Sequence, residues 1–520
     1  MPLMNTPFRK QRCSSMKLTL HLLLLGLLSA CATLPEDYPK EDSFAIPATA
    51  ETRLGLSATT WVSSHDGRSG FFPMQSGSVA LAARLRMIEH AEVSLDAQYF
   101  LMKPDIAGHI FCQELLLAAD RGVRVRFLLD DIFTEVSDEE LFILDAHENV
   151  EVRLYNPIAK TGFYYLNFLG DFKRANRRMH NKSFTADNQL TIVGGRNIAN
   201  EYFDLNIDTE FEDFDVLGVG KVATDVSVTF DLFWNSRRSL PLEALDVEFT
   251  EAQLDKVRQQ MKEEFDEAYA SVFAGAMENK IIRELIDTKD QLFPAGWEVI
   301  TDDPKKLKTK VAVEQRQHFN RLAELVVGAH EEVIVITPYL VPMKSGIEFW
   351  RGIVDRGTRV VMLTNSLAST NHIPVHSGYA KYRKPLLEAG VELYEARVDA
   401  VEHLAERPGA PDNKTLHTKL FIIDRNQVFA GSLNLDPRSI NLNAELGVNI
   451  MSEELGTELA DEFFDQLDET AYRVTLNDRG KLQWEGTING AKVIKTTEPS
   501  SSRWRRFKAW FFRIVPDSQL

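Results

Sequence analysis

Two stretches of the chain decide its fold: RMHNKSFTADNQLTIVGGRNIANEYFD at residues 178–204 and TLHTKLFIIDRNQVFAGSLNLDPRS at residues 415–439. In each, a histidine is followed by lysine, aspartate, glycine and asparagine at spacings of 2, 7, 14 and 17 residues. The two sets are His180, Lys182, Asp187, Gly194 and Asn197, and His417, Lys419, Asp424, Gly431 and Asn434. Each stretch is a β-rich apolar run broken by a turn, which predicts two strands. Residues two apart on a strand share a face, so each histidine and its lysine should point the same way.

The chain repeats itself beyond these two stretches. Helical and strand patterns alternate from residue 76, and the same succession returns from residue 318. Such alternation is typical of α/β folds, and its return predicts a tandem duplication of one α/β unit. We place the units at residues 76–245 and 311–475, with a helical connector at residues 246–310 between them.

Length and charge limit the classes of protein to which the chain can belong. With 520 residues it is long enough for two domains, and its 26% charged residues are ordinary for a globular protein. The formal net charge of −17 argues against a broad electrostatic grip on a nucleic-acid backbone, so we expect no nucleic-acid partner. Cys112 lies in an apolar helical run and is interpreted as a small core residue.

Residues 1–31 are interpreted as a targeting segment. Basic residues precede the apolar run LTLHLLLLGLLSA, which ends at small residues before Cys31. Residues 28–31 resemble a bacterial lipobox, which implies lipid attachment to Cys31 and a mature protein anchored in the cell envelope. It would face the periplasm from the outer or the inner membrane. An ordinary signal peptide or an uncleaved anchor is the alternative. Residues 32–75 are predicted to form a tether.

The tail at residues 476–520 differs from the rest of the chain. Its segment SSRWRRFKAWFFRIV places Trp504, Phe507 and Phe511 on one helical face and Arg505 and Arg506 opposite. A short basic, aromatic helix of this kind predicts binding to a membrane surface. A helix docked on the protein body is the alternative.

The duplicated histidines, lysines and asparagines predict phosphodiester chemistry. Lysine and the asparagine amide donate hydrogen bonds, so a cluster of them suits the non-bridging oxygens of a phosphodiester. One neutral imidazole can attack phosphorus while a protonated imidazole opposite delivers a proton to the leaving alkoxide. Positioned cations stabilise the developing charge, so we expect neither a metal ion nor another cofactor. The four predicted donors are Lys182, Lys419, Asn197 and Asn434.

The pattern HxKxxxxD followed by a glycine pair or Gly-Ser, one residue and Asn, in two copies, resembles the phospholipase D superfamily over residues 76–475. The resemblance implies two αβα sandwich units that form a pseudo-dimer with one shared active site. It implies a covalent phosphohistidine intermediate, with His180 the nucleophile and His417 the general acid/base. Asp187 and Asp424 match the motif's aspartates and are grouped with the catalytic residues, although their role in the family is more structural.

The same resemblance assigns the supporting residues. Glu445 matches the family carboxylate that orients a catalytic histidine. Ser432, Asn197 and Asn434 are assigned to the substrate phosphate, and Gly195 leaves the first motif without a hydroxyl at the place of Ser432. The candidates for the orienting carboxylate of the first half are Asp208, which we take as first choice, Glu210 and Asp213.

Stretches such as DFKRANRRMHNKSF (171–184) and HSGYAKYRKPLLEAGVELYE (376–395) resemble bacterial cardiolipin synthases of the C type. That resemblance implies a phosphatidyltransferase, acting as a monomer, that makes cardiolipin from phosphatidylglycerol and a second phospholipid, either phosphatidylglycerol or phosphatidylethanolamine. A phospholipase D-type hydrolase of phospholipids or other phosphodiesters would use the same residues. A non-catalytic lipid-binding envelope lipoprotein is the alternative from another class.

Overall fold

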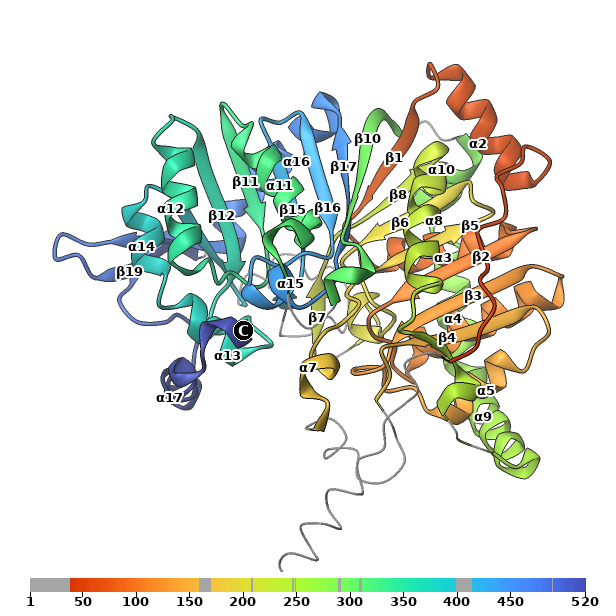
Figure 1. The fold of residues 1–520 in the computed structure, drawn as a ribbon. Helices are drawn as coiled ribbons and strands as arrows, with labels where there is room; N and C mark the ends of the chain where they lie inside the picture. The colour runs from red at the N-terminus through yellow and green to blue at the C-terminus, as the bar shows by residue number, and fades with distance from the viewer. Residues whose placement is uncertain are drawn as a thin grey trace, which may run out of the picture.

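The protein is described by a computed structural model over residues 38–158, 170–206, 209–245, 247, 249–288, 291–307, 311–398, 414–488 and 490–520. The predicted signal peptide, with Cys31, lies outside the described residues. Two α/β halves lie side by side, the N-terminal half at the right of Figure 1 and the C-terminal half at the left. Their strands join into one continuous sheet of 18 strands. The predicted α/β duplication is confirmed.

The first half contributes the strands on one side of this sheet. From the outer edge to the centre they are β9 (Ser239–Pro241), β4 (Val150–Tyr155), β3 (Arg124–Asp130), β2 (Ser94–Tyr99), β5 (Ser183–Ala186), β6 (Leu190–Gly194), β8 (Asp215–Val219) and β1 (Ser69–Met74). Strands β2, β3 and β4 are parallel, and β5 runs antiparallel to β2. The start of β5 therefore lies at the sheet edge where β2, β3 and β4 end.

The second half repeats this order on the other side of the centre. Outward from β1 come β10 (Phe293–Thr301), β17 (Leu446–Met451), β16 (Gln427–Gly431), β15 (Leu420–Ile423), β11 (Glu332–Ile336), β12 (Arg359–Asn365), β13 (Glu392–Ala396), β18 (Ala471–Leu476), β19 (Leu482–Ile488) and β20 (Ala491–Lys495). The antiparallel pair β1–β10 joins the halves. A separate parallel pair consists of β7 (Glu210–Glu212) and β14 (Lys414–Leu416).

Helices cover both faces of each half. In the first half they are α3 (Gly77–His90), α4 (Ile106–Asp120), α5 (Asp138–Asp145), α7 (Phe172–Ala175) and α8 (Lys221–Trp234). In the second they are α11 (Gln317–Val327), α12 (Met343–Val354), α13 (Ile373–Tyr379), α14 (Arg383–Glu388), α15 (Pro437–Asn441) and α16 (Glu453–Thr470). Alternation along β3 shows the sandwich: Phe127 and Leu129 enter the core with α3 and α4, whereas Leu128 enters the core with α8.

A hydrophobic core is shared between the halves. Phe71, Val193 and Phe214 of the first half lie in the same buried cluster as Ile334 and Ile422 of the second. Burying a side chain of this size contributes about 1.5–3 kcal/mol, so a few such residues stabilise the interface strongly. Strand β6 packs against β16 and β17. The two histidine motifs, which lie in the β5–β6 and β15–β16 hairpins, are therefore brought together by a packed interface.

The structure corrects the predicted tether at residues 32–75. Helix α2 (Arg53–Ser64) and strand β1 lie within it, and β1 pairs with both β8 and β10. Pro73 conceals this strand in the sequence because proline cannot donate to a β ladder. It is tolerated because the pairing with β10 ends at Phe71, so that Pro73 has a partner on β8 alone.

Two other predicted segments also contain strands. The connector at residues 246–310 contains α9 (Glu251–Met277) and α10 (Lys280–Thr288), as expected, but its end forms β10, whose pattern Pro294 and Gly296 obscure. The tail at residues 476–520 first completes the sheet with β19 and β20 and then forms α17 (Arg503–Phe511). No helix in the described part of the chain is both long and apolar enough to cross a membrane.

Candidate active site

The two histidine motifs begin on the backbone of the opposite half. Met179 forms a parallel bridge with Ala444, and β14 pairs in parallel with β7. The next residue of each motif is its histidine. The backbone N–H of His180 donates to the Ala444 carbonyl at 2.8 Å, and that of His417 donates to the Glu212 carbonyl at 2.7 Å. Each histidine is therefore positioned by the other half of the molecule.

The side-chain contacts of the histidines cross the interface in the same way. His180 Nδ1 lies 2.8 Å from Glu445 Oε2, and His417 Nδ1 lies 2.5 Å from Asp213 Oδ2. All four side chains are buried. An Nδ1–H that donates to a carboxylate fixes the tautomer in which Nε2 carries the reactive lone pair. The site therefore contains two histidine–carboxylate pairs, each made from both halves.

The structure assigns the carboxylate of the first half to one of the three candidates. Asp213 lies against His417. Glu210 instead lies 3.3 Å from Lys414. Asp208, the first choice from sequence, lies outside the described residues. The choice of Asp208 is therefore replaced by Asp213, which fills the position beside the Nδ1 atom of His417.

Both lysines are buried beside their histidines. Lys182 Nζ donates to the His180 carbonyl at 2.7 Å, and Lys419 Nζ lies 2.8 Å from His417 Nδ1 and also contacts the His417 carbonyl. Burial lowers the pKa of Lys182 to about 7 and that of Lys419 to about 8. The charge of Lys419 also lowers the pKa of Lys182, so the two motifs act on each other electrostatically. They form a single site.

Both histidines are neutral at neutral pH in this structure. Burial lowers the pKa of His180 well below its usual range, and Lys182 and Lys419 lower it further. Burial and Lys419 lower the pKa of His417 to about 4, although Asp213 opposes them. The duplicated motif predicts one neutral and one protonated imidazole. That expectation does not hold for this structure, because burial and the lysines keep both rings neutral; an anion bound near the lysines would favour positive charge on the rings.

The two asparagines lie beside the histidine pairs, with part of their hydrogen-bonding capacity unused. Asn197 Nδ2 donates to the Tyr202 hydroxyl at 2.9 Å, and Asn434 Nδ2 lies 3.5 Å from Ser439 Oγ. Within the described part of the chain, the buried Oδ1 atoms of both asparagines have no hydrogen-bond partner. Each amide carries two N–H donors, so one donor of each side chain can still serve a phosphate oxygen.

Ser432 and Gly195 differ because the carboxylates beside them differ. Ser432 Oγ donates to Glu445 Oε2 at 2.5 Å, so its proton is directed to this carboxylate and not to a substrate phosphate. In the first half, a Cβ at Gly195 would lie 2.1 Å from Asp213 Oδ1. No side chain fits there, which explains why the first motif lacks the serine.

The aspartates of the two motifs lie away from the histidines. Asp187 accepts hydrogen bonds from the backbone N–H groups of residues 92–94, and Asp424 from those of residues 330–332. Seven residues of extended chain place each about 20 Å from its histidine. Both have positive φ angles, 49° and 47°, at a hairpin turn. Their grouping with the catalytic residues is corrected: they fasten each motif hairpin to the strand beside it.

Two buried ion pairs that the sequence analysis did not identify support the site. Arg178 pairs with Asp130 at 3.1 Å just before the first motif. Lys306 pairs with Asp302 at 2.7 Å, and Asp302 also accepts the backbone N–H of Glu445 at 3.2 Å. The available signal was weak: Asp130 is the last residue of β3 and Asp302 directly follows β10, at the strand ends where the site lies.

Aromatic rings were also missed, and they cover both histidines. The ring of Phe100 meets that of His180 edge to face at a centroid distance of 4.7 Å. Phe211 stacks on His417 at 5.4 Å and 15°. Both rings exclude water from the imidazoles, in keeping with the lowered pKa values of the two histidines.

Among the described residues, neither Cys112 nor a cluster of acidic side chains forms a further reactive or metal-binding centre. Cys112 is buried, and burial raises the pKa of its thiol to about 12, which confirms it as a core residue and not a nucleophile. Of the residues that the structure describes, no group of three or more His, Cys, Asp or Glu side chains is placed to hold a metal ion.

The fold has a counterpart among solved structures. The phosphatidylserine synthase of Haemophilus influenzae Rd KW20 is similar with a TM-score of 0.52 and 12% identity, over 80% of this chain and 91% of that one. At this identity the likeness concerns the fold alone. The duplicated α/β unit and its paired HxK motifs define an enzyme of the phospholipase D superfamily.

Comparison of sequences identifies the family within this class. The model of the family described as "Cardiolipin synthase, PLD-like domain" matches residues 85–234 and 322–467. The chain is 37% identical over 473 residues to cardiolipin synthase C of Escherichia coli (strain K12), covering 89% of this chain and 98% of that protein. It is 23% identical to a cardiolipin synthase of Oceanobacillus iheyensis, over 76% of this chain and 68% of that protein. The chain belongs to the cardiolipin synthase family, and it is a phosphatidyltransferase of the phospholipase D superfamily.

Proposed function

We propose that this protein makes cardiolipin by transferring a phosphatidyl group, through His180, to the glycerol headgroup of phosphatidylglycerol. The donor would be a second phosphatidylglycerol or phosphatidylethanolamine. The observation that carries the proposal is the crossed arrangement of the site, in which His180 pairs with Glu445 and His417 pairs with Asp213. Two oriented imidazoles beside two buried lysines suit a double displacement at phosphorus.

In the first step, the Nε2 lone pair of His180 attacks the donor's phosphorus. The bond from phosphorus to the headgroup oxygen breaks, and His417 gives its proton to that oxygen, so the headgroup leaves as an alcohol and not as an alkoxide. Lys182 and Lys419 would hold the non-bridging oxygens. The products of this step are phosphatidyl-His180 and a neutral His417.

The second step reverses these roles. A hydroxyl of the acceptor phosphatidylglycerol gives its proton to His417 while its oxygen attacks phosphorus, and the bond to His180 breaks. Cardiolipin forms, His180 is regenerated, and His417 is again protonated. Water at the same place would yield phosphatidic acid, which is the hydrolase alternative. Whether transfer or hydrolysis occurs depends on whether the acceptor's hydroxyl or a water molecule reaches phosphorus.

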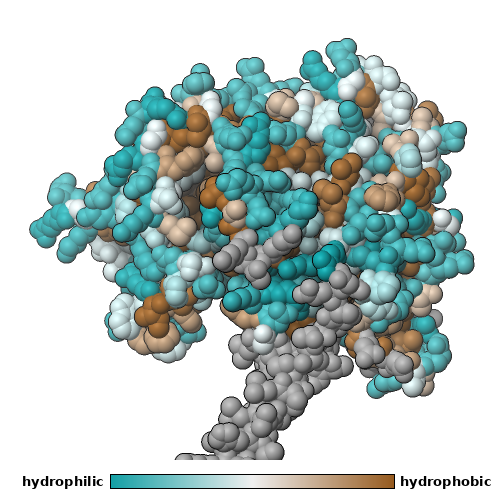
Figure 2. Space-filling model, viewed as in Figure 1, coloured by the Kyte–Doolittle hydropathy of each residue, from teal (hydrophilic) through white to brown (hydrophobic). Residues whose placement is uncertain are grey.

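The aromatic face of α17 supports binding to a membrane surface. Trp504, Phe507 and Trp510 of α17 are 62, 49 and 63% exposed, and Ile514 just after the helix is 75% exposed. Figure 2 shows apolar side chains gathered where α17 lies in Figure 1. The segment after α17 is also docked on the body, because Leu520 is buried beside Val341 and Val375. The two interpretations of the tail are compatible. The helix is held by the protein and presents aromatic rings outward.

A lipid product assay tests the transferase. The full chain in detergent would be incubated with phosphatidylglycerol, with and without phosphatidylethanolamine, and the products identified by mass spectrometry. We expect cardiolipin, lost in His180→Ala and retained in the control His330→Ala, which changes an exposed histidine outside the site. Phosphatidic acid alone would make the protein a hydrolase. Lipid binding without either product would favour the non-catalytic lipoprotein.

Membrane binding can be tested separately on α17. Replacing Trp504 and Trp510 by serine should weaken binding to anionic vesicles about tenfold or more, because both exposed rings lose contact with the bilayer. Turnover of detergent-dispersed lipid should change much less. The matched control is Phe44→Ser, which removes an exposed aromatic ring elsewhere (62% exposed). An equal effect on both measurements would indicate a structural tail.

A further inference from the structure

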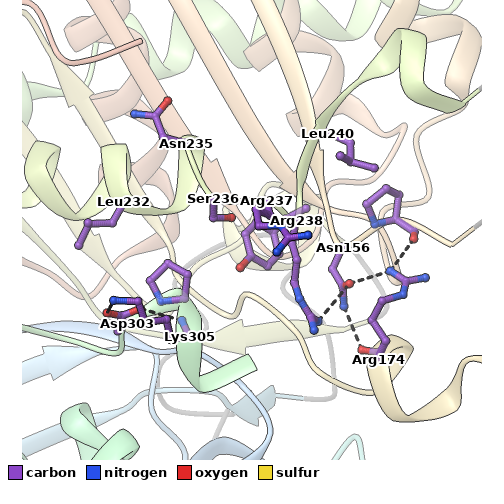
Figure 3. A pocket seen from close by; sticks show the side chains of 13 residues that line it. Asn156, Arg174, Leu232, Asn235, Ser236, Arg237, Arg238, Leu240, Asp303 and Lys305 are labelled. Atoms are coloured by element: carbon purple, nitrogen blue, oxygen red, sulfur yellow. Dashed lines mark hydrogen bonds and ion pairs between the residues drawn. The ribbon is translucent and has the colours of Figure 1, made fainter. Parts of the chain in front are cut away.

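A cavity of about 580 Å³ lies between the two halves, apart from the histidine pairs (Figure 3). Its lining from the first half comes from the end of β4, from α7 and from the turn between α8 and β9, including Asn156, Arg174 and Arg238. The second half contributes Asp303 and Lys305, just after β10. A volume of this size is typical of a small-molecule site.

The lining of this cavity is positively charged, although the chain carries a formal charge of −17. Four cationic side chains line it, with Asp303 the one carboxylate among the described lining residues. Arg174 pairs with Asp171 beside the cavity, and Lys305 lies 3.5 Å from Asp303. The cationic residues are Arg174, Arg237, Arg238 and Lys305. The cations still outnumber the carboxylates beside them, and an anionic occupant would offset the cost of holding partly buried like charges close together.

Arg238 shows this repulsion directly. Its hydrogen bond goes to a neutral partner, the Asn156 side-chain oxygen at 3.3 Å. Burial lowers the pKa of Arg238, and the nearby charges of Arg174 and Arg177 lower it further, although Tyr155 and Asp171 oppose them. An anion would relieve both effects and supply acceptors for the guanidinium fork.

Asn156 organises the polar wall of the cavity. It has a positive φ of 52°, a conformation that costs free energy outside glycine and is often found at functional sites. Its side-chain oxygen accepts from Arg174 at 2.7 Å as well as from Arg238, so two guanidinium groups converge on one atom. The side chains of Asn156, Arg174 and Arg238 are drawn together in Figure 3.

The wall of the cavity continues into the segment that carries His180. Asn156 Nδ2 donates to the Arg177 carbonyl at 2.7 Å, and Arg178 donates to the Asn156 carbonyl at 3.0 Å. Arg178 also pairs with Asp130, which accepts the backbone N–H of the residue before His180 at 2.9 Å. A molecule bound by Asn156 and Arg174 would therefore contact the hydrogen-bonded residues that position His180.

We propose that this cavity binds a phosphate group, held by Arg174, Arg238 and Lys305, as a second anion site distinct from the histidine pairs. The ligand is a phosphate ester of the kind found in a phospholipid headgroup, or free phosphate. Arginine forks bind two phosphate oxygens at once, and an exposed lysine at the rim adds a point charge. Lys305 fits the rim, because its side chain is 72% exposed.

Counting bound phosphate tests the proposal without requiring turnover. Equilibrium dialysis of the full chain in detergent against radiolabelled inorganic phosphate should show two sites per chain. Lys182→Gln should remove the site at the histidines and leave the cavity site. Arg238→Gln should weaken the cavity site about tenfold or more, since a hydrogen bond to a charged group is lost. Arg473→Gln, which removes an exposed charge on β18, is the matched control.

Two results would overturn the proposal. One is a single site that Lys182→Gln removes and Arg238→Gln leaves unchanged. The other is equal phosphate affinity in Arg238→Gln and Arg473→Gln. Failure here leaves the transferase untouched, because that activity is judged by lipid products. In Lys182→Gln, displacement of labelled phosphate by glycerophosphoglycerol would identify a headgroup site. Displacement by unlabelled phosphate alone would identify a free-anion site.

Discussion

The two histidines of the active site share a motif but differ in the carboxylate that each contacts. His180 contacts Glu445, and burial raises the pKa of this carboxyl to about 7. His417 contacts Asp213. Burial acts on Asp213 in the same direction, but Lys419 and His417 outweigh it and lower the pKa to about 2. One histidine therefore faces a carboxyl that is half-protonated near neutrality, and the other faces a permanent anion.

This difference shows how one duplicated motif can supply two chemical roles. A permanent anion stabilises an imidazolium, so His417 suits the group that must hold a proton during the cycle. His180 must be neutral before it attacks phosphorus, and a carboxyl of intermediate pKa disturbs that state less. The carboxylates, and not the histidines, distinguish nucleophile from acid/base in this proposal.

The largest effect should come from the histidines themselves. His180→Ala and His417→Ala should each lower kcat by about 10⁴-fold or more, since each removes one reacting group. The melting temperature should stay within a few degrees, because neither side chain contributes to the hydrophobic core. Lipid turnover and a thermal melt measure the two quantities. Near-normal turnover in either variant would rule out the two-histidine mechanism.

Substitution of Asp213 and of Glu445 should affect kcat unequally and so distinguish the roles of the two histidines. Asp213→Asn should lower kcat by about 10³-fold, because the imidazolium of His417 loses its anion. Glu445→Gln should cost about tenfold, because a neutral amide resembles the protonated carboxyl that already exists near pH 7. Kinetics of the two variants measured side by side test the comparison. Equal losses, or a larger loss in Glu445→Gln, would reverse the assignment of roles.

The pH dependence of kcat/KM should reflect the titration of Glu445 on its acid side and of the two lysines on its alkaline side. Below about pH 7, Glu445 becomes protonated and His180 loses an anionic partner. Above that range Lys182, with a pKa of about 7, and Lys419, with a pKa of about 8, lose the charges that hold the phosphodiester. A bell-shaped profile with its maximum near pH 7 is expected. In Glu445→Gln the acid limb should disappear, and an unchanged acid limb would assign it to another group.

The smallest effect concerns the residues beside the carboxylates. Gly195→Ser should destabilise the fold by about 1–3 kcal/mol, because its Cβ would lie 2.1 Å from Asp213 Oδ1. Ser432→Gly, the matched exchange in the other half, creates no clash; it removes the hydrogen bond to Glu445 and the one accepted from the Leu446 N–H, and should cost about 1–2 kcal/mol. Denaturant unfolding of both variants gives the comparison. Equal costs would mean that Asp213 moves aside freely.

Much of the fold and site could be predicted from sequence, because it depends on local spacing. His180, Lys182 and their second-half equivalents lie two residues apart on strands, and the duplication brings both pairs to one interface. The partner of His417 could not be chosen this way, since Asp213 lies 204 residues away and is one of three acidic candidates close together in the sequence. Only the register of β7 against β14 selects it.

The residues and the strand that were wrongly assigned from sequence also have local structural explanations. Asp187 and Asp424 belong to the motif in sequence, but strand length carries them to the far end of the hairpin, where they accept backbone N–H groups. Ser432 lies in sequence beside the phosphate-binding asparagine, but its hydroxyl turns to Glu445. Strand β1 could not be predicted because Pro73 breaks its pattern. Pro73 is tolerated because β10 pairs only with the part of β1 before it, and this arrangement leaves no signal in the sequence.

The central claim, that His180 is the nucleophile and His417 the acid/base, is tested most directly by trapping the intermediate. A phosphatidyl ester of p-nitrophenol needs no acid, because the phenolate leaves without a proton. In His417→Ala the second step lacks its base. We therefore predict a burst of about one nitrophenolate per chain and a phosphatidyl adduct that mass spectrometry locates on His180. An adduct on another residue, or a burst that persists in the double variant lacking both histidines, would contradict the account.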